Sequence, residues 1–213
     1  MKTLSILLIS LSSFWNVTND PYRKAMGEAI QEAYQVHDIT SCQLVLNKLE
    51  RIANANSAKW EPGYYLAYSN IMMGAFQIEN AKKDTYFDLS ITQADKLLAS
   101  NLTPDVRSEV LAVKGFALML KLNVDAASRG SVMSEEIFQT YQTALHFNDK
   151  NPRAMYLLAS MQYGMAQFMG TPTEQACLLN QKAQQYFDAE LADSSLYPKW
   201  GKEHSMAMLE SCK

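Results

Sequence analysis

The chain has 213 residues, of which 48% are hydrophobic and 19% charged, so it is long and apolar enough to bury a sizeable core. Its formal net charge is -3 and its Lys and Arg residues form no basic block, which excludes the usual electrostatic basis for binding nucleic acid. Only 8 Gly and 6 Pro are present, which argues against a turn-dense β sandwich.

The first segment, residues 1–18, differs from the rest of the chain. Lys2 precedes an apolar run from Leu4 to Leu11, which is typical of a secretory signal peptide. The run is shorter than the roughly 20 residues that span a bilayer, and no Cys directly follows it to carry a lipid. An ordinary first helix is the alternative. We predict a signal peptide over 1–18, a helical domain over 19–213, and export to the periplasm or the cell exterior, not as a lipoprotein.

Helical periodicity recurs along the rest of the chain, and no segment alternates with the two-residue period of a strand. Helix starts are marked by Asp20-Pro21, Thr103-Pro104, Asn151-Pro152 and a capping box over 171–174. The pattern predicts nine helices, over about 20–36, 38–55, 60–79, 82–100, 104–122, 131–148, 152–169, 172–191 and 199–211. The longest predicted loop runs from Asn123 to Gly130.

Three of these helices open alike and indicate an internal repeat. The similar openings place Ala112 45 residues after Ala67, and Ala159 47 residues after Ala112. Helix pairs at a near-constant period are typical of a stacked solenoid. We therefore predict an all-α superhelical array of about four antiparallel helix pairs with a C-terminal capping helix, Trp200 sealing its end.

The segment from Tyr141 to Ala154 resembles the junction between two tetratricopeptide repeats, in which a small Ala packs between helices and an Asn-Pro step opens the next helix. HEAT-type repeats, which share the longer period, are the second choice. The chain also resembles small exported tetratricopeptide-like proteins of Bacteroidetes-type bacteria, in the short stretches 22–26, 80–84, 128–130 and 200–203. This resemblance implies the fold and export but no activity.

No catalytic or zinc-binding motif is present, and the three His residues are far apart in sequence. We therefore expect neither enzymatic activity nor a cofactor. Met161, Met165 and Met169 form a thioether stripe of the kind that binds Cu(I), although core packing is the favoured interpretation.

A polar and aromatic stripe on one helix is the predicted binding surface. It consists of Tyr156, Ser160, Tyr163 and Gln167, and Tyr64 and Tyr68 hold the corresponding positions two repeats earlier. First helices of repeat pairs line the concave face of such arrays. We predict a scaffold that binds a protein or peptide; the alternative is a small-molecule carrier or sensor with an aromatic pocket. Packing of the tyrosines against a neighbouring helix is also open.

Two further predictions concern single side chains. Arg129, in the predicted loop, would bind an anionic group or cap the C-terminus of a helix. Cys177 and Cys212 would form a disulfide in an exported protein, whereas unpaired thiols are the alternative. The expected partner is a protein or peptide, with no nucleic acid and no transmembrane span in the mature chain, and the oligomeric state is left open.

Overall fold

A computed structural model describes residues 20–190 and 196–212. The predicted signal peptide lies outside these described residues. Within them the chain forms nine helices and no strand, which confirms the predicted all-α array of helix pairs. The helices are α1 (Pro21–Tyr34), α2 (Ile39–Ala55), α3 (Glu61–Phe76), α4 (Asn80–Leu98), α5 (Pro104–Val124), α6 (Ala126–Phe147), α7 (Pro152–Met169), α8 (Glu174–Ala189) and α9 (Lys202–Glu210).

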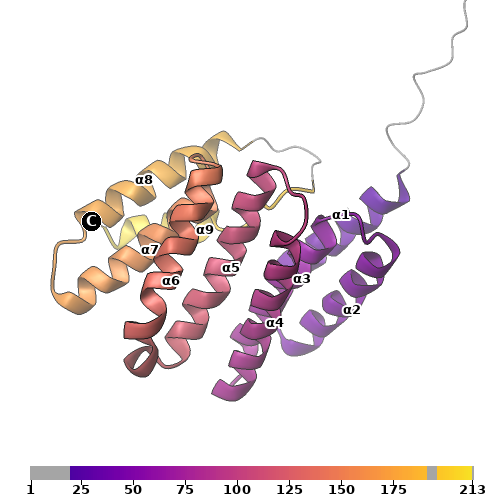
Figure 1. Cartoon of the computed structure of the whole chain (residues 1–213), viewed down its shortest axis with the longest axis horizontal. Helices are drawn as coiled ribbons and strands as arrows, with labels where there is room; N and C mark the ends of the chain where they lie inside the picture. The colour runs from indigo at the N-terminus through magenta and orange to yellow at the C-terminus, as the bar shows by residue number, and fades with distance from the viewer. Residues whose placement is uncertain (1–19, 191–195, 213) are drawn as a thin grey trace, which may run out of the picture.

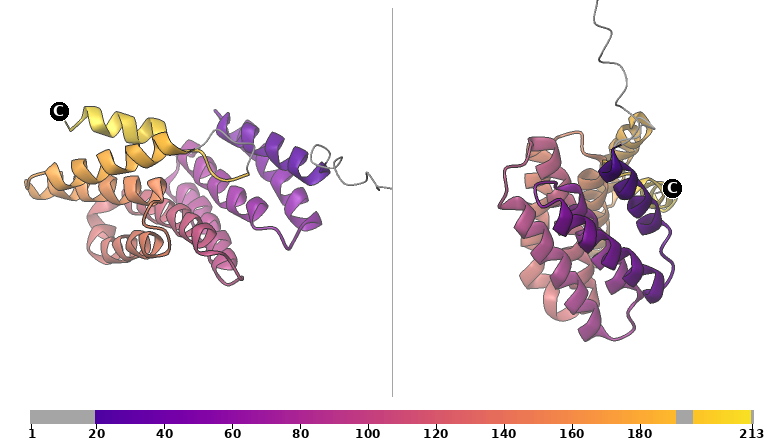
Figure 2. Two further views of the ribbon diagram at one scale, coloured as in Figure 1. Left: turned by 90° about the horizontal axis from the view of Figure 1, so that it is seen from above. Right: turned by 90° about the vertical axis from the view of Figure 1, so that its right-hand side faces the viewer.

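The helices form two layers (Figures 1 and 2). Each helix packs against the next along the chain, and α1, α3, α5 and α7 also pack in succession against one another. Ala67, Ala112 and Ala159, the alanines that define the repeat, are all fully buried. Small side chains at these positions let neighbouring helices approach closely, as the repeat predicts.

Three of the predicted helix caps are confirmed. The side chains of Asp20, Thr103 and Asn151 each accept a hydrogen bond from a backbone N–H in the first turn of the following helix. The predicted capping box over 171–174 is wrong, because Thr171 closes the preceding helix instead. Its N–H donates to the Ala166 carbonyl at 2.9 Å, and α7 ends at Gly170 with a φ of 65°.

The predicted loop from Asn123 to Gly130 is also wrong. Asp125 is both the C-cap of α5 and the N-cap of α6. Its carboxylate accepts a hydrogen bond from the Ser128 N–H at 3.3 Å. Helix α6 therefore begins at Ala126, and Arg129 and Gly130 lie in its first turns.

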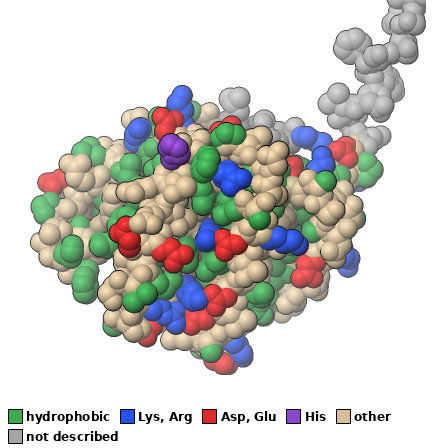
Figure 3. Space-filling model, viewed as in Figure 1, with side chains coloured by type: hydrophobic (Ala, Val, Ile, Leu, Met, Phe, Trp, Pro, Cys, Tyr) green, Lys and Arg blue, Asp and Glu red, His purple; other side chains and the backbone are tan. Residues whose placement is uncertain are grey.

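The outer face of the array carries charges of both signs side by side (Figure 3). Three aspartates, spaced along α4, each form an ion pair with a cation on α5 or α6: Asp84 with Arg129, Asp88 with Lys121, and Asp95 with Lys114. Because these charges neutralise one another locally, this face has no extended field of one sign to attract a charged partner.

The C-terminal part differs from its prediction. Helix α9 begins at Lys202, and residues 196–201 before it form a non-helical segment, here called the C-terminal strap. The strap leaves α9 and crosses towards α1 and α3 (Figure 2). None of the described helices has the length and hydropathy needed to cross a membrane.

Candidate functional site

The C-terminal strap packs on α1, α3 and α5. The indole of Trp200 lies between the rings of Tyr68 on α3 and Phe116 on α5, with centroid distances of 5.6 and 5.4 Å. The ring planes are inclined by only 30° and 21°, so both contacts are stacked. The indole Nε1–H donates to the Tyr64 hydroxyl at 2.9 Å. Trp200 is consequently only 8% exposed.

Two further tyrosines hold the strap backbone. The Lys199 N–H donates to the Tyr34 hydroxyl at 3.0 Å, and the Tyr65 hydroxyl donates to the Leu196 carbonyl at 3.1 Å. The two hydroxyls lie 3.2 Å apart. Because Tyr65 has a single hydrogen and gives it to Leu196, Tyr34 must donate to Tyr65. A continuous chain of hydrogen bonds therefore runs from one strap amide, through two phenols, to another strap carbonyl.

The predicted open groove lined by Tyr64 and Tyr68 is therefore corrected. Tyr64 is fully buried and Tyr68 is 8% exposed, because Trp200 covers both. Burial raises the pKa of both phenols, so they stay neutral. Trp200 also does not seal the end of the array as predicted, since it lies between α3 and α5. The local sequence around Tyr64 contains no signal for a partner 136 residues away.

The α7 stripe lies apart from this cluster and closer to the C-terminus. Tyr156 is half-buried and packs against the core, and the Tyr163 hydroxyl donates to the Ser211 carbonyl at 3.0 Å. Ser160 is partly exposed and Gln167 is exposed. The structure therefore does not bring this stripe together with Tyr64 and Tyr68 in one site.

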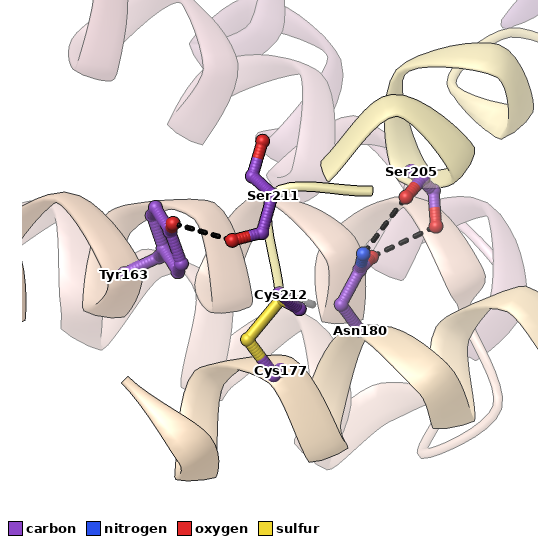
Figure 4. Close-up of a disulfide and its surroundings, with 6 residues drawn as sticks. All are labelled: Tyr163, Cys177, Asn180, Ser205, Ser211 and Cys212. Atoms are coloured by element: carbon purple, nitrogen blue, oxygen red, sulfur yellow. Dashed lines mark hydrogen bonds between the residues drawn. A yellow bond between two sulfur atoms is a disulfide. The ribbon is translucent and has the colours of Figure 1, made fainter. Parts of the chain in front are cut away.

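The C-terminus is anchored on α8 (Figure 4). Cys177 and Cys212 form a disulfide with a Cα–Cα distance of 5.8 Å. Beside it, the buried Asn180 side chain donates to the Ser205 carbonyl and accepts from the Ser205 hydroxyl, both at 2.8 Å. Cys42 is a free, buried thiol, and burial raises its pKa to about 11. Cys42 is therefore protonated and unreactive at neutral pH.

Arg129 does not offer a free charge to an anion. Its guanidinium makes two hydrogen bonds to the Asp84 carboxylate, at 2.6 and 2.7 Å, and a third to the Lys121 carbonyl. Of the two predicted roles, the contact to a carbonyl near the end of α5 is the one observed. The Arg129 hydrogen bond holds the pKa of Asp84 below its usual range.

A buried charged network lies beside a polar cleft of about 300 Å³. The Arg153 guanidinium bonds Glu109 at 2.8 and 2.9 Å and also reaches Glu190, and Arg153 and Glu109 are less than 5% exposed. Burial raises the pKa of Glu109, while the Arg153 charge opposes that rise. The cleft is lined by three carboxylates and two cations, so its charge does not favour an anionic ligand: Asp105, Glu109 and Glu190 against Lys150 and Arg153.

A second cleft, of about 400 Å³, lies between α1 and α2. Its lining is mostly aliphatic and aromatic, with cations at the rim: Pro21, Tyr22, Ala25, Lys48, Arg51, Ile52, Ala55 and Asn56. Lys48 is paired with Glu32 at 2.8 Å, whereas the exposed Arg51 guanidinium contacts no other described charge. The Tyr22 hydroxyl donates to Glu61 at 3.0 Å. Sequence reasoning missed this cleft because its residues face each other only once the hairpin forms.

Metal binding finds no support in the described part of the chain. No group of three or more His, Cys, Asp or Glu side chains there is arranged to hold a metal ion. Met161 is 7% exposed and Met165 packs against the same core, while Met169 is 58% exposed. The methionine stripe therefore belongs mainly to the core, as favoured from the sequence.

Comparison with known proteins identifies the fold. The chain matches no protein-family profile and no curated protein, so the tetratricopeptide assignment stays a prediction. Its structure is similar to a solved structure described as the HusA haemophore from Porphyromonas gingivalis, with a TM-score of 0.78 and 23% sequence identity. The similarity covers 90% of this chain and 92% of that chain. The two proteins therefore share one helical fold over nearly their whole length.

Proposed function

We propose that this protein is a non-catalytic carrier of a small molecule, which binds in the cleft between α1 and α2. The observation that carries the proposal is an open, largely apolar cleft of about 400 Å³, lined by the Arg51 guanidinium, which forms no ion pair with the described residues. Ligand sites of this kind are typically a few hundred Å³ and apolar, with a few polar groups that orient the ligand. The similar fold belongs to a protein named as a haemophore, so haem is the first ligand to test.

The lining of the cleft favours a flat apolar ligand that carries a carboxylate. Ala25, Ile52 and Ala55 offer aliphatic contact, and the Arg51 guanidinium is suited to hold a carboxylate through two parallel hydrogen bonds. Burial raises the pKa of Tyr22, and the Glu61 carboxylate raises it further. Tyr22 is therefore a neutral phenol, and apolar contact with charge pairing would hold the porphyrin here.

The α1–α2 cleft is open to a ligand, whereas the face predicted for an open peptide scaffold is already occupied by the strap. The strap covers Tyr64 and Tyr68, the aromatic residues on which a scaffold would depend. Export remains part of the proposal. Mature protein from the cell envelope should lack residues 1–18 when its N-terminus is sequenced by mass spectrometry.

The binding test is a titration of the purified protein with haem and with metal-free protoporphyrin, followed by absorbance. We expect both porphyrins to bind, and Arg51→Glu to weaken binding by about tenfold, since a hydrogen bond to a charged group contributes about 1.5 kcal/mol. Lys96→Glu reverses an exposed charge on α4 and serves as the control that should bind normally.

Two results would contradict different parts of this proposal. If neither porphyrin binds the unaltered protein, the assignment as a porphyrin carrier is wrong. If porphyrin binds but Arg51→Glu and Lys96→Glu bind it equally well, the ligand lies outside the α1–α2 cleft.

A further inference from the structure

We infer that the concave face of α1, α3 and α5 is a recognition groove for an extended peptide segment containing a tryptophan, and that the C-terminal strap is its resident occupant. This site is separate from the α1–α2 cleft and does not depend on the porphyrin proposal. The partner is identified by the chemistry of the strap itself, which shows what the groove recognises.

The strap is bound in the alternating manner of an extended peptide. Leu196, Pro198 and Trp200 are buried, whereas Tyr197 and Lys199 between them are exposed. This two-residue period is the signature of an extended chain whose alternate side chains enter a surface. The groove therefore contacts every second side chain of the strap, as peptide-binding domains do with an extended ligand.

The groove recognises the backbone separately from the side chains. The linked hydroxyls of Tyr34 and Tyr65 satisfy one N–H and one C=O of the strap, and any residue type supplies those two groups. Sequence preference comes instead from Trp200, whose indole fills the slot between Tyr68 and Phe116 and bonds Tyr64. The groove thus prefers an extended segment with a tryptophan at one end.

The neutral side chains of the groove further restrict which peptide segments can bind. Burial raises the pKa of Tyr34, Tyr64 and Tyr65, so these hydroxyls remain neutral. The only charged strap side chain, Lys199, is exposed instead of entering the groove. An apolar or aromatic segment, without charges at the buried positions, therefore fits best.

The C-terminal helix has anchors of its own that do not involve the strap. Helix α9 is held to α8 by the Cys177–Cys212 disulfide and by the Asn180–Ser205 hydrogen bonds, neither of which involves the strap (Figure 4). The junction between strap and α9 is Gly201, whose φ of 102° is a conformation suited to glycine. The residues that contact the strap belong to α1, α3 and α5, which are separate elements from the strap and α9.

Because the strap already occupies the groove, any added peptide must compete with it. A tethered segment has an effective concentration in the millimolar range, so a free peptide of the same sequence should bind the unaltered protein only weakly. Trp200→Ala empties the aromatic slot, so the strap no longer competes for it. Trp200→Phe is a second variant, whose smaller ring keeps apolar contact with Tyr68 and Phe116.

The experiment measures binding of a fluorescently labelled, end-blocked peptide with the sequence of residues 196–201 to the full-length, disulfide-bonded variants. We expect Trp200→Ala to bind it at least about tenfold more tightly than the unaltered protein does. A peptide in which the tryptophan is replaced by alanine should bind at least about tenfold more weakly than the parent peptide.

The inference is overturned if both variants keep their helical circular dichroism and bind neither peptide, or if they bind the two peptides equally. Porphyrin titration of the same variants separates this result from the carrier proposal. Absence of peptide binding with retained porphyrin binding overturns only the groove, and peptide binding without porphyrin binding overturns only the carrier proposal.

Discussion

Gly115 on α5 lies directly against the ring of Tyr141 on α6. A Cβ atom at this position would overlap the ring of Tyr141 on α6, which is fully buried. We predict that Gly115→Ala destabilises the protein by about 1–3 kcal/mol, because the Tyr141 ring must leave a well-packed position. Chemical unfolding followed by circular dichroism measures this change.

The control is Gly27→Ala on α1, where no neighbouring atom lies within 4 Å of the added Cβ. Here alanine should stabilise the protein by about 0.5–1 kcal/mol, since it restricts the unfolded chain without a clash. Equal effects of the two substitutions would show that helix propensity, and not the contact with Tyr141, decides the outcome.

Residue roles were predictable where the partner is close in sequence. The caps at Asp20, Thr103 and Asn151 depend on backbone groups two or three residues away, so their residue types identify them. The roles of Tyr64 and Trp200 depend on each other across 136 residues. No local pattern encodes that contact, and the same tyrosines therefore suggested an open groove.

The ion pair between Asp84 and Arg129 connects α4 to α6, and its contribution to stability should depend on pH. The hydrogen bond from Arg129 lowers the folded-state pKa of Asp84 below its unfolded value, so the stability it contributes is present above the unfolded pKa of about 4. This contribution is lost as the pH falls through the folded-state pKa. Asp84→Asn should therefore destabilise the protein by about 1 kcal/mol or less at pH 7, and the difference should vanish in acid.

Thermal unfolding between pH 7 and pH 2.5 tests this dependence. Asp149→Asn, which removes an exposed carboxylate outside any described ion pair, is the matched control. A deficit of Asp84→Asn that stays constant across the pH range would mean that the carboxylate charge is not what stabilises the contact.

The presence of each helix was easier to predict than its first and last residues. Each predicted helix is present, because apolar periodicity over three or more turns is a strong signal. The start of α6 was missed because Ser128-Arg129-Gly130 resembles a loop. The correct signal was Asp125 with Ser128 three residues later, and Gly130 is accommodated within the helix with open space around it.

At the scale of the whole molecule, the repeat predicts the array but not what occupies its concave side. The near-constant period follows from contacts between adjacent helix pairs, so sequence similarity between the pairs records it. The strap belongs to no repeat and packs on helices from the opposite end of the chain. The α1–α2 cleft likewise arises from the way one hairpin closes, which a single sequence does not specify.

The disulfide between Cys177 and Cys212 links α8 covalently to the residues that follow α9. It closes a loop of 35 residues that contains most of α8, the strap and α9, and a loop of this length contributes roughly 3–4 kcal/mol of stabilisation. Since α9 packs mainly on α8, Cys212→Ser should accelerate hydrogen exchange in α9 while α3 and α5 remain protected. Reducing agent should reproduce this change in the unaltered protein and add nothing to the variant, in which Cys42 is still buried. Unchanged exchange in α9 would mean that Asn180 and Ser205 suffice to anchor the helix.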